Sequence, residues 1–271
     1  MSDLNEPVDL FLFMGQSNMA GRGIACPRFP AKAPACLEHA GYEFRAVSDP
    51  TKLYPVAEPF GANENRPGGI YEPGMKTGSL VTAFINAYYI ETQVPIIAVS
   101  AAKGGSAISE WLPGTPFLSD AIQRFQGAAA FLETQSYLIR HKYMVWCQGE
   151  TDGTNKTDPE KYKQCFLRMW EKLACEGIEH CFLIRIGNYN AAADPEAPLQ
   201  DYSSIIRAQD QLASLYPFVT MVSVKFTEML HRGLMKDAYH YYQQAYNEVG
   251  AEAGFYTACY VNNIAPQSTR R

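Results

Sequence analysis

Five short apolar runs alternate along the chain with longer segments that carry apolar residues at helical spacing. The runs cover residues 8–14, 95–100, 143–147, 181–186 and 219–224. Each run is shorter than a typical helix and rich in β-branched or aromatic residues, which is typical of strands buried on both faces of a parallel sheet. The pattern therefore predicts a five-stranded, mostly parallel sheet.

The segments between these runs have helical character. The expected helices cover residues 77–92, 119–140, 158–176, 202–215 and 241–253. Ser119 and Asp120 can cap the second of them, Pro159 suits the first position of the third, and Gly177 ends it. Strands that alternate with helices, joined by right-handed crossovers, place helices on both sheet faces. We expect a three-layer α/β/α sandwich.

The segment 23–76 breaks this alternation. It holds many Pro and Gly residues and shows little periodicity. We interpret it as a long loop insertion after the first strand, over one end of the sheet, with one short helix near 33–41. Loops of this length in a compact domain are usually functional or disordered. With no internal repeat and no break that suggests a second core, we expect one domain over residues 1–271.

Composition narrows the class of protein. The 271 residues are 47% hydrophobic and 19% charged, which excludes a disordered, collagen-like or coiled-coil chain. The net charge of -5 argues against a nucleic-acid partner. No apolar run approaches the ~18 residues of a membrane span, so no membrane partner is expected either. The pattern does not indicate an oligomeric state.

The two chain features that report on compartment are the N-terminus and the cysteines. Residues 1–7 are acidic and polar, without the basic start and apolar stretch of a secretory signal. The seven Cys include no Cys-x-x-Cys pair, so we expect buried, reduced thiols. We therefore expect a cytoplasmic protein as the chain stands, or a secreted one if a signal was removed.

Candidate chemistry lies just after the apolar runs, because ligands of open α/β sheets bind at the carboxyl ends of the strands. Ser17 follows the first run, where a strand-to-helix turn would project its hydroxyl as a nucleophile and the next N–H groups would favour an oxyanion. Gly104 and Gly105 follow the second, where the backbone can approach a ligand closely. The structural alternatives are that Ser17 only caps the following helix and that the two glycines only form a turn.

The third and fifth runs add polar side chains. Gln148 follows the third run and can donate to an oxyanion, and Glu150 and Asp152 can be a general base, a metal ligand or structural acids. No matching His cluster accompanies the two carboxylates, so we expect no metal. After the fifth run, Asp237 and His240 are three apart, so a turn can bring the carboxylate to the imidazole.

Four motifs together resemble a known family. They are LFMGQSNMAGRG at 12–23, KGGSAISEW at 103–111, WCQGETD at 146–152 and Asp237-x-x-His240. They resemble, in order, the blocks of the sialate O-acetylesterase and acetyl xylan esterase-like group. This group is carbohydrate esterase family six of the SGNH (GDSL-like) hydrolases. The resemblance implies a flavodoxin-like fold. One departure is Thr151 where the family usually has Ser.

The resemblance also implies roles for residues. Ser17 would be the nucleophile, His240 the base and Asp237 the group that orients it. The N–H groups of Ser17 and Gly105 and the Gln148 side chain would form the oxyanion hole. The residues expected to bind substrate are Gln16, Asn18, Arg22, Gly104, Glu150 and Trp111. Arg22 could meet a substrate carboxylate, although a structural role in the turn is the favoured interpretation.

The implied function is that of a serine esterase which removes O-acetyl groups from a carbohydrate through an acyl-enzyme. The substrate would be a small molecule or an oligosaccharide, such as an acetylated xylo-oligosaccharide or an O-acetyl sialic acid. No metal or organic cofactor is needed. The alternatives are an esterase for non-carbohydrate acyl esters, a non-catalytic carbohydrate-binding protein, and a cysteine enzyme that uses Cys147.

Overall fold

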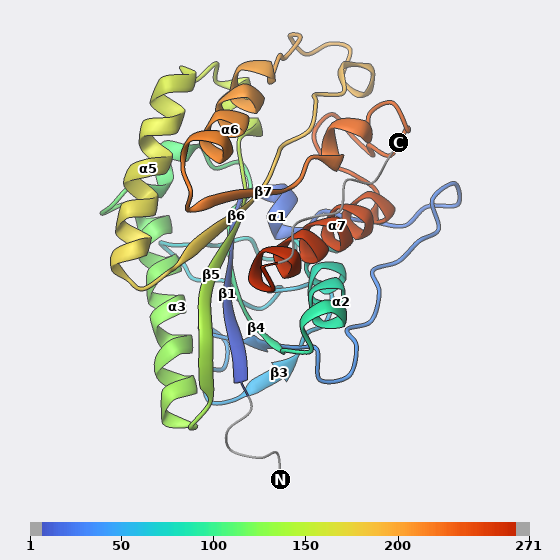
Figure 1. Ribbon diagram of the computed structural model, residues 1–271. Helices are drawn as coiled ribbons and strands as arrows, with labels where there is room; N and C mark the ends of the chain where they lie inside the picture. The colour runs from blue at the N-terminus through green and yellow to red at the C-terminus, as the bar shows by residue number, and fades with distance from the viewer. Residues whose placement is uncertain (1–6, 264–271) are drawn as a thin grey trace.

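The computed structural model describes residues 7–263 and shows a seven-stranded sheet between two layers of helices (Figure 1). The N-terminal residues 1–6, where a leader would begin, lie outside the described residues. The strands are β1 (Pro7–Gly15), β2 (Gly41–Phe44), β3 (Leu53–Pro55), β4 (Ile96–Ala102), β5 (Leu138–Cys147), β6 (His180–Ile184) and β7 (Val219–Ser223). They lie in the order β3-β2-β4-β1-β5-β6-β7, and every neighbouring pair is parallel except β2–β3.

The helices cover both faces of this sheet. They are α1 (Ser17–Ala20), α2 (Val81–Thr92), α3 (Pro116–Thr134), α4 (Glu150–Thr154), α5 (Pro159–Cys175), α6 (Ser203–Leu215) and α7 (Gln243–Val261). Figure 1 shows α3, α5 and α6 on one side of the sheet and α2 and α7 on the other. The predicted three-layer α/β/α fold is therefore confirmed, with seven strands instead of five.

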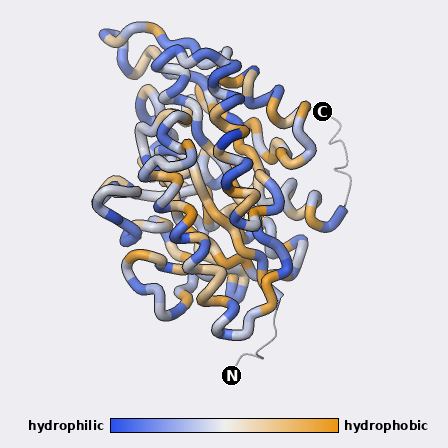
Figure 2. Tube along the Cα trace, turned by 90° about the vertical axis from the view of Figure 1, so that its left-hand side faces the viewer, coloured by the Kyte–Doolittle hydropathy of each residue, from blue (hydrophilic) through white to orange (hydrophobic). Residues whose placement is uncertain are grey.

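The central strand β1 divides the core between the two faces. Leu10 and Leu12 belong to the hydrophobic cluster under α3, α5 and α6, whereas Phe11 and Phe13 belong to the cluster under α2 and α7. All four side chains are buried. Figure 2 shows this apolar centre with polar segments around it. Since both faces are covered, the strand is apolar at nearly every position.

Helix boundaries differ from the predicted ones where a local feature decides. Helix α3 begins at Pro116 and not at Ser119, because proline suits the first helical position. It ends at Thr134, and the chain then turns through Ser136 (φ 61°) into β5, so residues 138–140 are strand and not helix. Helix α5 has the expected Asp158 cap, whose carboxylate accepts the Lys161 N–H at 3.0 Å.

The long insertion contains two strands and not the expected helix near 33–41. Strand β2 pairs in parallel with β4, and β3 pairs with β2, so the insertion widens the sheet. The fully buried Arg124 of α3 then ties the insertion down. Its guanidinium donates to the carbonyls of Glu64 and Ser100, each at 3.0 Å, and to the Asp120 carboxylate. These contacts fix the loop segment around residue 70 over the sheet edge.

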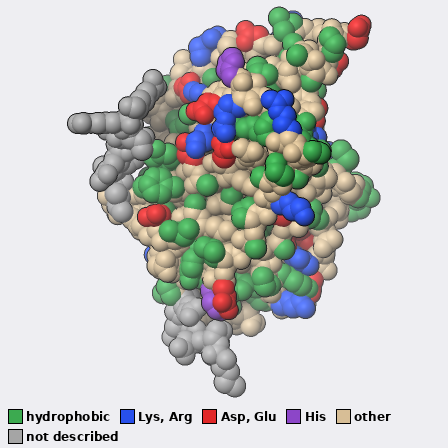
Figure 3. All heavy atoms as spheres, turned by 90° about the vertical axis from the view of Figure 1, so that its right-hand side faces the viewer, with side chains coloured by type: hydrophobic (Ala, Val, Ile, Leu, Met, Phe, Trp, Pro, Cys, Tyr) green, Lys and Arg blue, Asp and Glu red, His purple; other side chains and the backbone are tan. Residues whose placement is uncertain are grey.

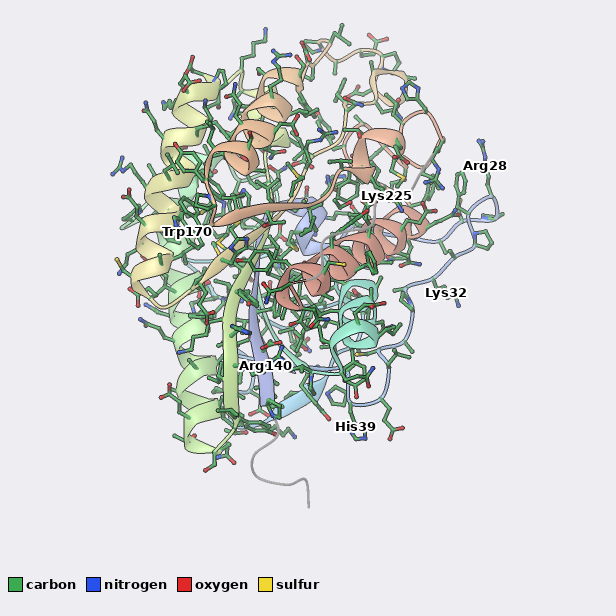
Figure 4. All side chains as sticks on the ribbon, viewed as in Figure 1. Arg28, Lys32, His39, Arg140, Trp170 and Lys225 are labelled. Carbon is green, nitrogen blue, oxygen red and sulfur yellow. The ribbon has the colours of Figure 1, made fainter. Side chains whose placement is uncertain are left out.

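Charged groups near the amino ends of strands β1 and β5 stabilise the fold. Arg140 lies on β5 (Figure 4) and donates to buried Asp9 at 2.6 Å, and Asp9 also accepts from Tyr88 at 2.5 Å. A buried carboxylate paired in this way avoids the cost of an isolated charge. On the face in Figure 3, Lys and Arg side chains lie among Asp and Glu side chains and form no patch of one sign.

Candidate active site

A cavity of about 520 Å³ lies where the carboxyl ends of β1, β4 and β5 meet. The residues that line it come from five segments: the turn after β1, the long insertion, the loop after β4, the segment after β5 and the loop before α7. They are Gln16, Ser17, Arg22, Tyr71, Glu72, Pro73, Met75, Lys103, Gly104, Gly105, Glu150, Thr151, Thr154, Tyr239 and His240. The sequence predicted this location from the ends of the strands.

The turn that presents Ser17 depends on Gly15. This residue has φ 141°, and a Cβ added to it would lie 2.0 Å from the carbonyl oxygen of Cys147. Only glycine allows β1 to end this close to β5. The next residue, Gln16, donates its N–H to the same carbonyl at 2.9 Å. Ser17 then begins α1 and faces the cavity.

Ser17, His240 and Asp237 form a continuous hydrogen-bonded chain. His240 Nε2 lies 2.9 Å from Ser17 Oγ, and His240 Nδ1 lies 3.0 Å from Asp237 Oδ1 and 3.1 Å from Oδ2. The three residues come from opposite ends of the chain, and the fold brings them together at the cavity wall. The arrangement matches what a nucleophile, a general base and an orienting carboxylate require.

The loop that carries Asp237 and His240 is closed by its own backbone. Lys236 donates its N–H to the His240 carbonyl at 2.9 Å, and Asp237 Oδ1 accepts the N–H groups of Tyr239 and His240, each at 2.8 Å. Partial burial alone would raise the pKa of Asp237. The hydrogen bonds from His240, Lys236 and the backbone outweigh this effect and hold that pKa well below its ordinary value.

The backbone N–H groups of Ser17 and Gly105, two residues that line the cavity, have no acceptor among residues 7–263. Gly105 has φ 70°, and no atom lies within 4 Å of an added Cβ, so its backbone borders open space. The neighbouring Gly104 N–H donates instead to Glu72 Oε1 at 2.7 Å. The geometry thus leaves Ser17 and Gly105, and not Gly104, as backbone donors to a bound group.

The structure does not bring Gln148 to the cavity. Its side chain is fully buried, and its Nε2 donates to the Ser106 carbonyl at 3.0 Å and to Asp152 Oδ2 at 2.6 Å. An amide nitrogen has two hydrogens, so both are used inside the protein. The expectation that Gln148 completes an oxyanion hole is corrected by these contacts.

Gln16 offers the amide donor that Gln148 does not. Its Oε1 accepts the N–H groups of Gly149 at 3.1 Å and Thr151 at 3.3 Å, which fixes the orientation of the amide. The Nε2 then has no acceptor among the residues that the structure describes. Because Gln16 lines the cavity beside Ser17, this amide nitrogen is available as a donor to a bound substrate.

Asn18 and Glu150 support the site from beneath. Asn18 is fully buried; its Nδ2 donates to Glu150 Oε1 at 2.5 Å, and its Oδ1 accepts from Tyr246 at 2.6 Å. Asn18 is therefore held by the protein and does not line the cavity, contrary to expectation. Glu150 does line it. Burial raises the pKa of Glu150, and the hydrogen bond from Asn18 opposes this.

Trp111 and Arg22 also differ from expected substrate contacts. Trp111 is fully buried in the core, donates to Ser106 Oγ at 3.0 Å and packs edge-on against Trp146. Arg22 does line the cavity, but its Nη2 donates to Glu72 Oε1 at 2.8 Å. The favoured structural interpretation of Arg22 agrees with this ion pair.

One wall of the cavity contains residues that the sequence did not single out. It comes from the insertion residues Tyr71, Glu72, Pro73 and Met75. Tyr71 and Met75 are about half exposed, whereas Glu72 is buried. The insertion shows no periodicity that could single these residues out. Only its position after the first strand signalled that part of it would reach the site.

Two observations concern the metal-ligand residue types and the cysteine that the sequence analysis considered. Residues 7–263 contain no group of three His, Cys, Asp or Glu side chains arranged to hold a metal ion. Cys147 is fully buried at the end of β5, and burial raises its pKa well above the ordinary value. A buried thiol of this kind is a poor nucleophile.

A model of the family described as carbohydrate esterase, sialic acid-specific acetylesterase, matches residues 7–256. The chain belongs to this family of carbohydrate esterases and is a carboxylic ester hydrolase. A search of curated protein sequences found no match.

Solved structures share the fold at low sequence identity. An Arabidopsis thaliana protein is 20% identical, with a TM-score of 0.69 over 96% of this chain and 100% of that one. NanS is 15% identical, with a TM-score of 0.60 over 95% and 98%. A carbohydrate acetylesterase from Xanthomonas citri is 18% identical, with a TM-score of 0.57 over 93% of this chain and 55% of that one.

Among residues 7–263, none of the helices has the length and apolar character to span a membrane.

Proposed function

We propose that the protein is a serine esterase that removes O-acetyl groups from a carbohydrate through an acyl-enzyme on Ser17. The observation that carries this proposal is the hydrogen-bonded chain Ser17–His240–Asp237 at the wall of a cavity large enough for a sugar unit. The family and the name of one structural neighbour, the carbohydrate acetylesterase from Xanthomonas citri, support acetyl esters of carbohydrates as substrates.

In the first half of the reaction, His240 Nε2 takes the proton of Ser17 Oγ while Oγ attacks the acetyl carbonyl carbon. Asp237, at 3.0 Å from Nδ1, stabilises the imidazolium that forms. When the tetrahedral intermediate collapses, the bond between the acetyl carbon and the sugar oxygen breaks. His240 gives its proton to that oxygen, and the sugar leaves with a free hydroxyl.

In the second half, water attacks the acetyl-Ser17 ester. His240 takes a proton from the water as its oxygen bonds to the carbonyl carbon. Collapse of this second intermediate returns the proton to Ser17 Oγ and releases acetate. The same imidazole thus acts as base and then as acid in each half. The reaction consumes the ester and one water molecule, and Ser17 is regenerated.

The proposed oxyanion hole has two backbone donors and one side chain. The N–H groups of Ser17 and Gly105 belong to cavity-lining residues and have no acceptor in the described part of the chain, and Gln16 Nε2 is the available amide. Donors aimed at the developing oxyanion act in the transition state, where one of them is typically worth 10²–10³ in rate, about 3–4 kcal/mol.

The test is acetate release from acetylated xylan, an O-acetyl sialic acid, a peracetylated monosaccharide and an aryl acetate. Ser17→Ala should abolish release, since the nucleophile is removed. Ser119→Ala, on α3 and outside the cavity lining, is the matched control and should keep the activity. Release that persists in Ser17→Ala would refute the serine mechanism. No release by the unaltered, folded protein from any substrate would refute acetylesterase function.

A further inference from the structure

The cavity wall nearest Ser17 contains a buried ion pair that none of the proposed chemical steps uses. Glu72 Oε1 accepts from Arg22 Nη2 at 2.8 Å and from the Gly104 N–H at 2.7 Å. The side chains are only 9% and 4% exposed for Arg22 and Glu72, respectively. Charge-assisted hydrogen bonds of this kind are strong, so the guanidinium is committed to Glu72.

This pair lies directly beside the nucleophile. A Cβ added to Gly104 would lie 2.4 Å from Glu72 Oε1, 2.6 Å from Arg22 Nη2 and 3.4 Å from Ser17 Cβ. The carboxylate, the guanidinium and the nucleophile therefore surround one glycine. A sugar whose acetyl group reaches Ser17 must place its neighbouring substituents close to this pair.

The second cation of the cavity is also held by Glu72. Lys103 Nζ lies 3.8 Å from Glu72 Oε1 and donates to the Gly104 carbonyl at 3.1 Å. The two cations that line the cavity are thus answered by one carboxylate. A further carboxylate, Glu150, lines the same cavity. A carboxylate on a substrate would meet neither cation without Glu72 beside it, and it would also face Glu150.

The second carboxylate oxygen of Glu72, Oε2, is buried and has no hydrogen-bond donor in the described part of the chain. An unpartnered buried carboxylate oxygen is costly, and it leaves part of the negative charge of Glu72 uncompensated at the cavity wall. Next to it, Tyr71 presents a half-exposed ring at the cavity, a surface suited to the apolar face of a sugar.

We infer that Glu72 sets the substrate class: by pairing with Arg22 and placing a negative charge at the cavity wall, it selects acetyl esters of uncharged sugars over those of sugars that carry a carboxylate. This inference rests on the proposed esterase function and names the substrate class of the same site. It makes Glu72 a specificity-determining residue contributed by the long insertion.

The test uses a matched pair of substrates, an O-acetylated methyl glucoside and the corresponding O-acetylated methyl glucuronide, which differ by one carboxylate. The unaltered protein should have a kcat/KM at least about tenfold higher for the glucoside. Glu72→Gln removes the negative charge and releases Arg22, so the ratio should shift at least about tenfold toward the glucuronide. Because the readout is a ratio within each variant, a general loss of activity cancels.

Two further variants keep the test decisive. The double variant Arg22→Gln/Glu72→Gln removes the pair together and leaves Lys103 as a free cation, so its ratio should also move toward the glucuronide. Glu133→Gln, an exposed change at the end of α3, is the matched control and should keep the original ratio. The double variant carries the test if Glu72→Gln does not fold.

The outcomes separate this inference from the function on which it rests. If the unaltered protein releases no acetate from either sugar or from an aryl acetate, the proposed function fails. If it is an esterase but prefers the glucuronide, the inference is overturned. An unchanged ratio in the folded Glu72→Gln variant, or in the double variant if Glu72→Gln does not fold, overturns it as well.

Discussion

At the scale of single residues, the site depends on which polar groups are already used. Gln148 and Asn18 have their amide groups bonded within the protein, whereas Gln16 keeps a free Nε2 at the cavity. Sequence motifs do not distinguish these cases, because all three residues are amides that follow closely after an apolar run. The hydrogen-bond network therefore decides which amide can act on a substrate.

Gln16→Glu tests the proposed amide donor. The new side chain can still accept the N–H groups of Gly149 and Thr151, but it replaces the Nε2 donor with a carboxylate oxygen. We expect kcat to fall by about 10²–10³ with little change in Tm. For comparison, Gln148→Met should chiefly lower Tm, because Asp152 loses a buried donor. A Gln148→Met protein with normal Tm and a lost kcat, beside a fully active Gln16→Glu, would contradict the assignment.

Asp237→Asn tests the orienting carboxylate through activity and through pH. The amide cannot stabilise the imidazolium, so kcat should fall by about 10²–10⁴. Because the folded-state pKa of Asp237 is lowered, its contribution to stability is fully present above the unfolded value of about 4. It is lost as the pH falls through the folded-state pKa.

The free energy of unfolding, measured in urea from pH 3 to pH 7, checks this sign. The difference between the unaltered protein and Asp237→Asn should be constant at pH 5–7 and should shrink below pH 4. A difference that grows as the pH falls would show that the native fold does not favour the charged form of Asp237.

At the scale of elements, the close packing of α2 and α7 positions the loop that carries His240. Helix α7 begins at Gln243, just after this loop. Gly250 and Gly254 face α2; a Cβ on Gly254 would lie 2.1 Å from the Phe84 carbonyl oxygen, and one on Gly250 would lie 2.2 Å from that of Leu80. The two helices can approach this closely only because both positions lack a side chain.

Gly254→Ala should push these helices apart. Overpacking typically costs about 1–3 kcal/mol, and here the obstacle is backbone, so we expect a loss near the upper end. For a chain of this size that loss lowers Tm by about 5–10 °C. Gly127→Ala in α3 is the control, because its Cβ would meet only Phe44 at 3.7 Å. Equal effects of the two changes on Tm would contradict the packing argument.

At the scale of the whole molecule, the insertion is part of the site because Arg124 joins it to the sheet. Arg124 contacts the carbonyls of Glu64 in the insertion and Ser100 in β4, while its partner Asp120 accepts the Ile70 N–H at 2.8 Å. The cavity wall at Tyr71 follows immediately after Ile70. A buried charge pair on the rear of the insertion thus holds the substrate-facing side in place.

Arg124→Met leaves Asp120 without its buried partner, which typically costs about 3–5 kcal/mol and should lower Tm by about 10 °C. The KM for a sugar ester should rise in the folded fraction, since the wall is less well fixed. Arg66→Met is the control: Arg66 also reaches Asp120, at 3.2 Å, but its side chain is 33% exposed, so its loss should matter little. A normal Tm and KM for Arg124→Met would refute this role.

The sequence predicted the parts of the fold that local patterns encode. All five apolar runs are strands, and Asp158, Pro159 and Gly177 mark the ends of α5 as expected. It also singled out Ser17, His240 and Asp237, which the structure connects by hydrogen bonds. The strands β2 and β3 were missed, because they are short and depend on pairing with β4 and with each other.

The cavity wall around Glu72 was missed for a related reason. Its position depends on buried contacts between residues far apart in the chain, such as Arg124 with Glu64 and Glu72 with Arg22. No periodic pattern records contacts of this kind. For the same reason, Trp111 was expected in the site, although its ring is buried in the core against Trp146.

The most direct test of the central claim is capture of the acyl-enzyme. The protein is mixed with an aryl acetate, quenched in acid within the first turnover, digested and mapped by mass spectrometry. The proposed mechanism predicts one acetyl group, on Ser17, that is absent from Ser17→Ala. An acetyl group on another residue of the site, or acetate release at full rate with no acetylated peptide at any quench time, would contradict it.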